Sequence, residues 1–357
     1  MPTLSTGPSA RVQARAASLE SASLTARFFA VFLALGMLAG FASDDAFAIP
    51  EAGSVLFFPL YDSAPGSGTV IAVTNTFTSR RNCSDSRLEG DVRLHYIYFD
   101  GESCREFDRF EYLTPGDTLT ILADEHNPEG DRGYLIVLAL SPSGGLVNFN
   151  HLIGQAIIVQ SGLDVAWSYN AFAALAVGEV ADPCDRTNPD DTSEGGDRDF
   201  RADFDGVEYE MLTDEVALPT FFEEGDRFGN QLALMSTTGG YRIETSILLY
   251  NNVEDQFSRS FDFECWWTGS LSEITLAAED LGGDPEETGH GVQTGWMTIR
   301  GRRVRDDSGG VVLDPETGEA IVPALIGVFM QRIAGTDFAS GDFLYGRGDK
   351  IDGGDLP

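Results

Sequence analysis

Short runs rich in β-branched and aromatic residues recur along most of the chain, and they constrain the fold more than any other feature. They include VLFFPLY (55–61), GTVIAVTNTF (68–77), VRLHYIYFD (92–100), YLIVLAL (134–140), NQLALMST (230–237) and YRIETSILLYNN (241–252). Several of them alternate apolar and polar residues, and turn-forming clusters such as APGS (64–67) and TPGD (114–117) separate them. Short strands at this spacing predict an all-β protein made of sandwiches or barrels, and not of βαβ units.

Two segments depart from the strand pattern. Residues 164–177, DVAWSYNAFAALAV, are rich in alanine and begin with Asp164, a residue type that caps helices, so they predict a short helix. Residues 181–206 hold nine acidic side chains, two prolines and a Gly-Gly pair, with almost no apolar periodicity. That composition predicts an acidic linker or a long surface loop.

The sequences on the two sides of this acidic segment share landmarks in the same order, which predicts an internal duplication. The matched landmarks are 69–76 with 245–252, Cys104 with Cys265, 118–125 with 273–280, Gly133-Tyr134 with Gly295-Trp296, and 152–166 with 325–339. We therefore expect two tandem β-sandwich domains, immunoglobulin-like or jelly-roll-like, over residues 49–180 and 207–348. Residues 349–357 would form a polar tail.

A leader-like segment precedes the first strand. Arg27 stands before the apolar run FFAVFLALGMLAGFA (28–42), and Ala46-Phe47-Ala48 offers the small-x-small pattern of a cleavage site. The run is too short to span a bilayer comfortably as a helix, which disfavours a membrane anchor. We predict a signal peptide over residues 1–48, cleaved after Ala48, and export to the periplasm or the extracellular space. No second apolar run of spanning length follows, so we expect no membrane span after cleavage.

The chain contains four cysteines, Cys83, Cys104, Cys184 and Cys265. An even number in an exported chain predicts disulfides, and four cysteines allow three connectivities. We favour Cys83 with Cys104 and Cys184 with Cys265, because each bond then stays within one predicted domain. The spacings lack a C-x-x-C motif and a nearby histidine pair, so they do not indicate a zinc site.

The chain is strongly acidic, with 57 acidic and 23 basic residues and a formal net charge of −34. Such a charge repels phosphate backbones and anionic lipid surfaces, which disfavours nucleic acids and membranes as partners. A solvated acidic surface accounts for this composition, and calcium binding is the alternative. Asp199, Asp203 and Asp205 form the closest calcium-like set, although Arg201 interrupts the EF-hand pattern. We predict no other cofactor.

The chemistry-bearing motifs of common enzymes are missing from the sequence. It contains no G-x-S-x-G and no H-E-x-x-H motif. Trp266 and Trp267 are the best ligand-binding candidates, because neighbouring strand residues point to opposite faces and one ring could stack on a sugar. The other interpretation places one tryptophan in the core and one at its rim.

These observations favour an exported, non-catalytic protein with a binding, structural or adhesion role and a protein or glycan ligand. Such an architecture is common among adhesion and ligand-binding modules. One alternative is a secreted carbohydrate-active hydrolase that uses two carboxylates, since two acids at a suitable separation suffice for that chemistry. The second alternative is a calcium-stabilised adhesion module.

Overall fold

The computed structural model describes residues 52–83, 88–160, 165–178, 188–190, 201–222, 227–238, 240–274, 294–314 and 318–351, with residues 196, 199, 224, 353 and 355–356. The chain divides into two compact units, Met1–Ile49 and Pro50–Pro357, and all described residues belong to the second. The predicted signal peptide lies outside the described residues. Within them, no helix has the length and apolar character needed to cross a membrane.

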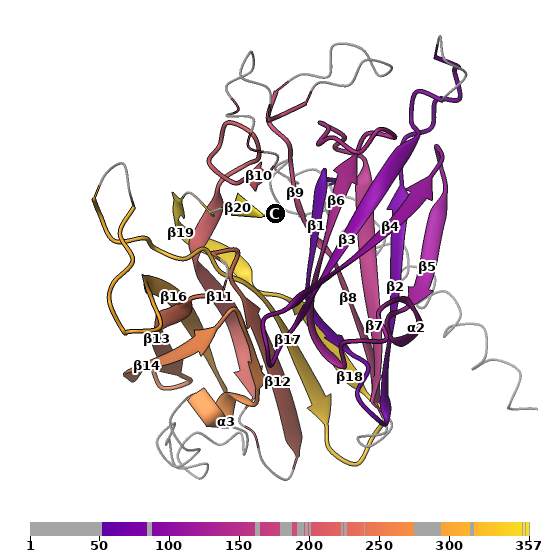
Figure 1. The fold of residues 1–357 in the computed structure, drawn as a ribbon. Helices are drawn as coiled ribbons and strands as arrows, with labels where there is room; N and C mark the ends of the chain where they lie inside the picture. Colours follow the sequence, from indigo (N-terminus) through magenta and orange to yellow (C-terminus); the bar gives the residue numbers. More distant parts are fainter. Residues whose placement is uncertain are drawn as a thin grey trace, which may run out of the picture. The chain divides into compact units, whose positions relative to one another are not determined.

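The first half of the described chain consists of antiparallel strands and one short helix. Its elements are β1 (Val55–Asp62), β2 (Ser67–Asn75), β3 (Val92–Asp100), β4 (Glu106–Leu113), β5 (Thr118–Leu122), α2 (Ala123–His126), β6 (Arg132–Leu140), β7 (Leu152–Gln160), β8 (Val165–Asn170) and β9 (Phe172–Ala174). They form a five-stranded sheet, β4-β3-β6-β1-β9, and a four-stranded sheet, β5-β2-β7-β8 (Figure 1). The chain crosses repeatedly between the two sheets, so the five-stranded sheet is complete only when β9 is in place.

The second half contains one nine-stranded antiparallel sheet of order β18-β17-β12-β15-β14-β13-β16-β11-β19. Its elements, with the small β10-β20 sheet, are β10 (Ala202–Asp203), β11 (Leu212–Phe222), β12 (Phe228–Met235), β13 (Arg242–Asn251), β14 (Gln256–Glu264), β15 (Trp266–Gly269), α3 (Leu271–Ile274), β16 (Thr294–Arg305), β17 (Ile326–Ile333), β18 (Ala339–Phe343), β19 (Tyr345–Ile351) and β20 (Asp355–Leu356). Strands β14 and β15 pair only through Glu264 and Trp266. Cys265 lies between these residues with a positive φ of 38°, so the nine strands divide there into groups of five and four.

These two groups repeat the strand order of the first half. The order β14-β13-β16-β11-β19 corresponds to β4-β3-β6-β1-β9, and β15-β12-β17-β18 corresponds to β5-β2-β7-β8. The registers agree as well. β1 has a bulge between Phe58 and Tyr61, and β11 has one between Leu218 and Phe221. The nine strands of one half therefore have structural counterparts in the other, residue by residue where the registers agree.

Only some of the sequence landmarks lie at equivalent positions of the two halves. The matches Gly133-Tyr134 with Gly295-Trp296 and Leu152-Ile153-Gly154 with Leu325-Ile326-Gly327 mark equivalent strands. The other three matches are wrong. Residues 69–76 in β2 correspond to 230–237 in β12, because 245–252 lies on the counterpart of β3. Residues 118–125 correspond to 266–273, and the two matched cysteines lie at different turns.

The predicted all-β class is confirmed, with several antiparallel sheets, but the two halves are not separate sandwich domains. The β12–β17 region is buried on both faces. Ala233 and Val328 belong to a core cluster shared with the first half, whereas Leu232 and Leu234 belong to the core of the second half. Successive sheets thus pack face to face, and the arrangement resembles a four-bladed propeller more than two independent sandwiches.

Two local predictions also change. The helix predicted over 164–177 is wrong, because Val165–Asn170 forms β8 and Phe172–Ala174 forms β9. Buried and exposed residues alternate strictly along β8, and this period-two pattern outweighs the alanine content. Much of the acidic segment 181–206 lies outside the described residues, but Phe204 near its end is fully buried and packs 5.4 Å from the Phe57 ring.

Candidate functional site

A disulfide between Cys104 and Cys265 joins the two halves, with a Cα–Cα distance of 6.2 Å across 161 residues of sequence. Both predicted pairings, Cys83 with Cys104 and Cys184 with Cys265, are therefore wrong. They assumed that each bond stays within one half, whereas the packed halves bring Cys104 and Cys265 together. Cys83 is also disulfide-bonded, and Cys184 lies outside the described residues.

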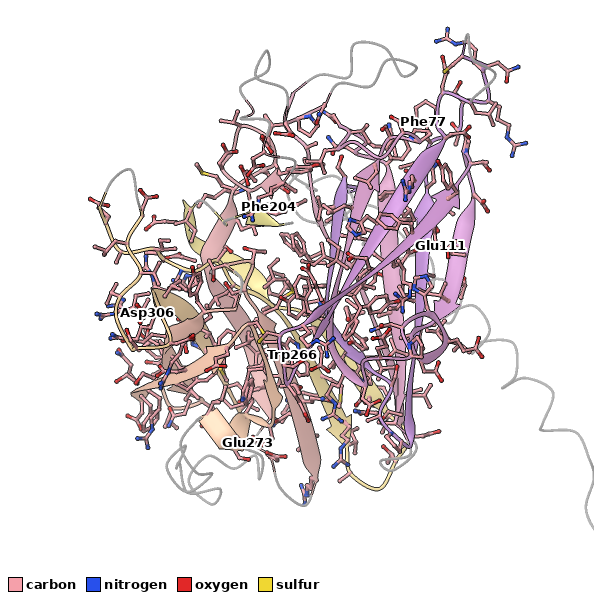
Figure 2. All side chains as sticks on the ribbon, in the orientation of Figure 1. Phe77, Glu111, Phe204, Trp266, Glu273 and Asp306 are labelled. Carbon is pink, nitrogen blue, oxygen red and sulfur yellow. A yellow bond between two sulfur atoms is a disulfide. The ribbon has the colours of Figure 1, made fainter. Side chains whose placement is uncertain are left out.

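The two neighbouring tryptophans differ in burial. Trp266 is only 8% exposed, and its indole Nε1 donates a 2.7 Å hydrogen bond to the backbone oxygen of Pro59 in the first half. Figure 2 shows Trp266 where the two halves meet. Trp267 is partly exposed and packs edge-to-face on Phe261 at 5.4 Å. Because neighbouring residues of β15 point to opposite faces, Trp266 is buried between the halves and part of the Trp267 ring stays accessible to solvent.

A pocket of about 370 Å³ opens beside the disulfide, and both halves line it. The lining residues are Gly101, Glu102 and Cys104 from the first half, and Arg242, Asp262, Phe263, Glu264, Trp266 and Trp267 from the second. We call this the seam pocket. It brings together the two tryptophans that the sequence singled out, together with charged residues that the sequence did not distinguish from the other acids.

The charged residues of the seam pocket are partly paired. Arg242 donates two hydrogen bonds to Asp262 Oδ2, from Nε at 3.0 Å and from Nη2 at 2.5 Å. Glu102 and Glu264 are exposed at the same pocket. Carboxylate acceptors, a guanidinium donor and the Trp267 ring together suit a ligand that combines hydroxyl groups with an apolar ring face.

The three aspartates predicted to bind calcium interact with nearby backbone and side chains. The Oδ1 atom of Asp205 accepts hydrogen bonds from the backbone N–H groups of Val207 at 2.7 Å and Glu208 at 3.0 Å. The Oδ1 atom of Asp199 accepts a 2.8 Å hydrogen bond from the backbone N–H of Arg201. Asp203 is the second residue of β10. Among the described residues, no group of three or more His, Cys, Asp or Glu side chains is placed to hold a metal ion. Calcium binding stays a prediction.

The first half also contains a half-buried polar cluster that the sequence reasoning missed. Tyr98 Oη lies 2.9 Å from His126 Nδ1, and His126 Nε2 lies 3.5 Å from Glu111 Oε1. Arg109 Nε donates a 2.8 Å hydrogen bond to the His126 backbone oxygen, and the Tyr96 ring meets the imidazole edge-on at 5.0 Å. The available signal was the pair of tyrosines at inward positions of β3.

The counterparts of this cluster in the second half are apolar. Tyr96, Tyr98, Glu111 and His126 correspond by strand register to Ile247, Leu249, Phe261 and Ile274. Three of these belong to the second apolar core, and the phenylalanine packs against it. Because one fold accepts either set, the polar set is not required for the architecture. A polar group in such a position costs stability unless it is well paired, so its presence suggests a specific role.

The cluster predicts a pH-dependent stability. Burial lowers the pKa of His126, and the neighbouring Glu111 opposes that shift. The folded state therefore favours neutral imidazole, and this contribution is complete above the unfolded pKa of about 6.5 and is lost as the pH falls below it. We expect the stability difference between wild type and His126→Gln to shrink between pH 8 and pH 5.5, measured by urea unfolding. His95→Gln, which lies outside the cluster, is the control; a constant difference for His126→Gln would contradict the assignment.

Comparison of the chain with protein-family models and with curated proteins finds no match.

Proposed function

We propose that this chain is an exported, non-catalytic binding protein and that the seam pocket takes a carbohydrate ligand. The observation that carries the proposal is the partly exposed Trp267 ring in a pocket that also contains carboxylates and a guanidinium group. Sugars present an apolar ring face and several hydroxyls, so a flat aromatic side chain and charged hydrogen-bonding groups complement them. A structural or adhesive role outside the cytoplasm agrees with such binding.

Two features support a preformed site. The Cys104–Cys265 bond and the buried Trp266 both connect the halves that line the pocket, so the pocket walls are tied together before a ligand arrives. Pre-organised sites avoid part of the ordering cost of binding. The leader-like segment supports export, and disulfides persist in the oxidising compartments outside the cytoplasm.

The repeated strand order further supports an internal duplication followed by divergence. We infer that the second half kept an apolar interior, whereas the first half acquired or kept the polar cluster around His126. The seam pocket belongs to neither repeat alone, because residues of both halves line it. The binding site would therefore have become available only in the duplicated chain.

The pocket assignment predicts that Trp267→Ala weakens sugar binding with little effect on folding. A glycan array with residues 49–357 identifies the ligand, and titration calorimetry then measures its affinity. We expect Trp267→Ala to weaken binding at least about tenfold, because truncation of a central aromatic contact has effects of this size or larger.

Trp296→Ala is the matched control, since Trp296 is also partly exposed but stacks on Tyr250 at 4.6 Å, outside the pocket. It should bind as wild type does. Failure of the folded wild-type protein to bind any sugar, or wild-type affinity in Trp267→Ala, would contradict the proposal.

A further inference from the structure

The sheet β5-β2-β7-β8 has an outward face without a single charged residue. We define this outer face by its central apolar residues, Val70, Leu122, Ile153, Ile157 and Val159, which alternate with inward-facing positions along their strands. Ser, Thr, Ala, Asn, Gln and Gly fill the remaining outward positions. The exposed fractions are 43% for Leu122, 36% for Ile153, 39% for Ile157 and 46% for Val159.

The geometry of this face is regular. Leu122, Val70 and Ile157 pair across three neighbouring strands in one row, and β2 pairs with β7 from Ser67 to Asn75 without a bulge. A regular sheet with small polar and branched apolar residues can pack closely against a second sheet. Exposed apolar surfaces of this kind commonly mark interaction sites.

The corresponding face in the second half is already an interface. Val70 and Ile157 correspond by register to Gln231 and Met330, which pair in the same way. Met330, with Ala233 and Val328 of the same face, belongs to the core cluster shared with the first half. Thus the repeat uses this face for packing in the second half, whereas the first half leaves it exposed.

Strand β1 of the first half packs against β12 and β17, where the corresponding face of the second half belongs to the shared core. Leu56 and Phe58 of β1 point toward Gly154 in their own half, so Val55 and Phe57 lie on the opposite side of the strand. The counterparts of Val55 and Phe57 on β11 are Glu215 and Ala217.

Glu215 is paired with Arg347, so the second half offers a charged surface at this place. Phe57 itself is fully buried, so its surface in a second copy is not available for packing. The outer face of a second copy, by contrast, is uncharged and partly exposed, so it can take the place of that surface.

We propose that two copies of this chain associate through their outer faces, sheet against sheet, around a two-fold axis. A two-fold interface brings the same patch of both copies together, so the patch must complement itself. The net charge of −34 makes most pairs of surfaces repel, whereas the outer face carries no charge and is free of that repulsion. Ile157 lies in the middle row of the face and would meet the outer face of the partner copy.

Sedimentation of residues 49–357 tests the proposal. We expect a dimer for the wild type and a monomer for Ile157→Glu, because a carboxylate in the interface would be buried without a partner. Leu313→Glu, at an apolar residue that is 55% exposed and lies outside the sheet, is the matched control and should remain dimeric. Added salt should strengthen the wild-type dimer, because it screens repulsion between the acidic copies.

A second variant keeps the test independent of folding defects. Ile157→Cys should form an intermolecular disulfide under mild oxidation if the two faces meet at this residue, and Leu313→Cys should not. A wild type that stays monomeric over the whole concentration range would overturn the proposal, as would a dimer that persists in Ile157→Glu. Sugar binding at the seam pocket is measured separately, so either proposal can fail without the other.

Discussion

Removal of the Cys104–Cys265 bond should destabilise the protein by about 5 kcal/mol, since a cross-link that closes a loop this long strongly restricts the unfolded chain. The two cysteines are separated by 161 residues, and they connect the halves at the edge of the seam pocket. The measurement is guanidinium unfolding without reductant, for the double variant Cys104→Ala/Cys265→Ala against wild type.

The single variants provide the control for this experiment. Because either substitution alone removes the bond, each single variant should lose about as much stability as the double variant. Strictly additive losses would mean that the two side chains act separately. A loss below about 1 kcal/mol in the double variant would contradict the role assigned to the bond, because native disulfides typically contribute 2–5 kcal/mol.

Replacement of Trp266 by alanine should cost about 3–5 kcal/mol, the usual range for a buried tryptophan. Its ring fills the space beside Gly101, where an added Cβ would come within 2.2 Å of a ring carbon. Its Nε1 also donates the hydrogen bond to Pro59 across the halves. The alanine variant would leave both a cavity and a buried carbonyl oxygen without its donor.

Trp267→Ala is the neighbouring control and should cost less than about 2 kcal/mol, since partly exposed side chains contribute less to stability. Thermal and urea unfolding of the two variants give the comparison. Equal losses would show that the different burial of the two rings does not determine their contribution. The two variants also distinguish effects on stability from effects on binding, because Trp267→Ala is expected to lower sugar affinity more than it lowers the free energy of unfolding.

The strand pattern predicted the fold class well because it depends on local alternation. Runs such as 92–100 and 241–252 show period two, and each forms a strand with almost the predicted limits. The same rule would have corrected the error at 165–170, where alternation was present but alanine content was given more weight. Local periodicity does not reveal which strands pair, so only two of the five repeat landmarks marked equivalent positions.

Features that depend on packing between the halves could not be predicted in this way. The disulfide partners, the shared core and the seam pocket all join residues that are distant in sequence. The cluster around His126 needs the short helix α2 to follow β5 at the open edge of the sheets. In the sequence, no motif links Tyr98, Glu111 and His126. Only the fold brings these three side chains within contact distance.

The connectivity of the seam disulfide also bears on how the protein matures. If the chain is exported as we propose, Cys83 and Cys104 reach the oxidising side well before Cys265, and they are close enough in sequence to pair with each other. Such an early bond differs from the native one, in which Cys104 is joined to Cys265. Reaching the native state would then require thiol–disulfide exchange after the second half has been translocated. A host that lacks disulfide isomerase activity should accordingly accumulate mispaired protein, even when oxidation itself is efficient.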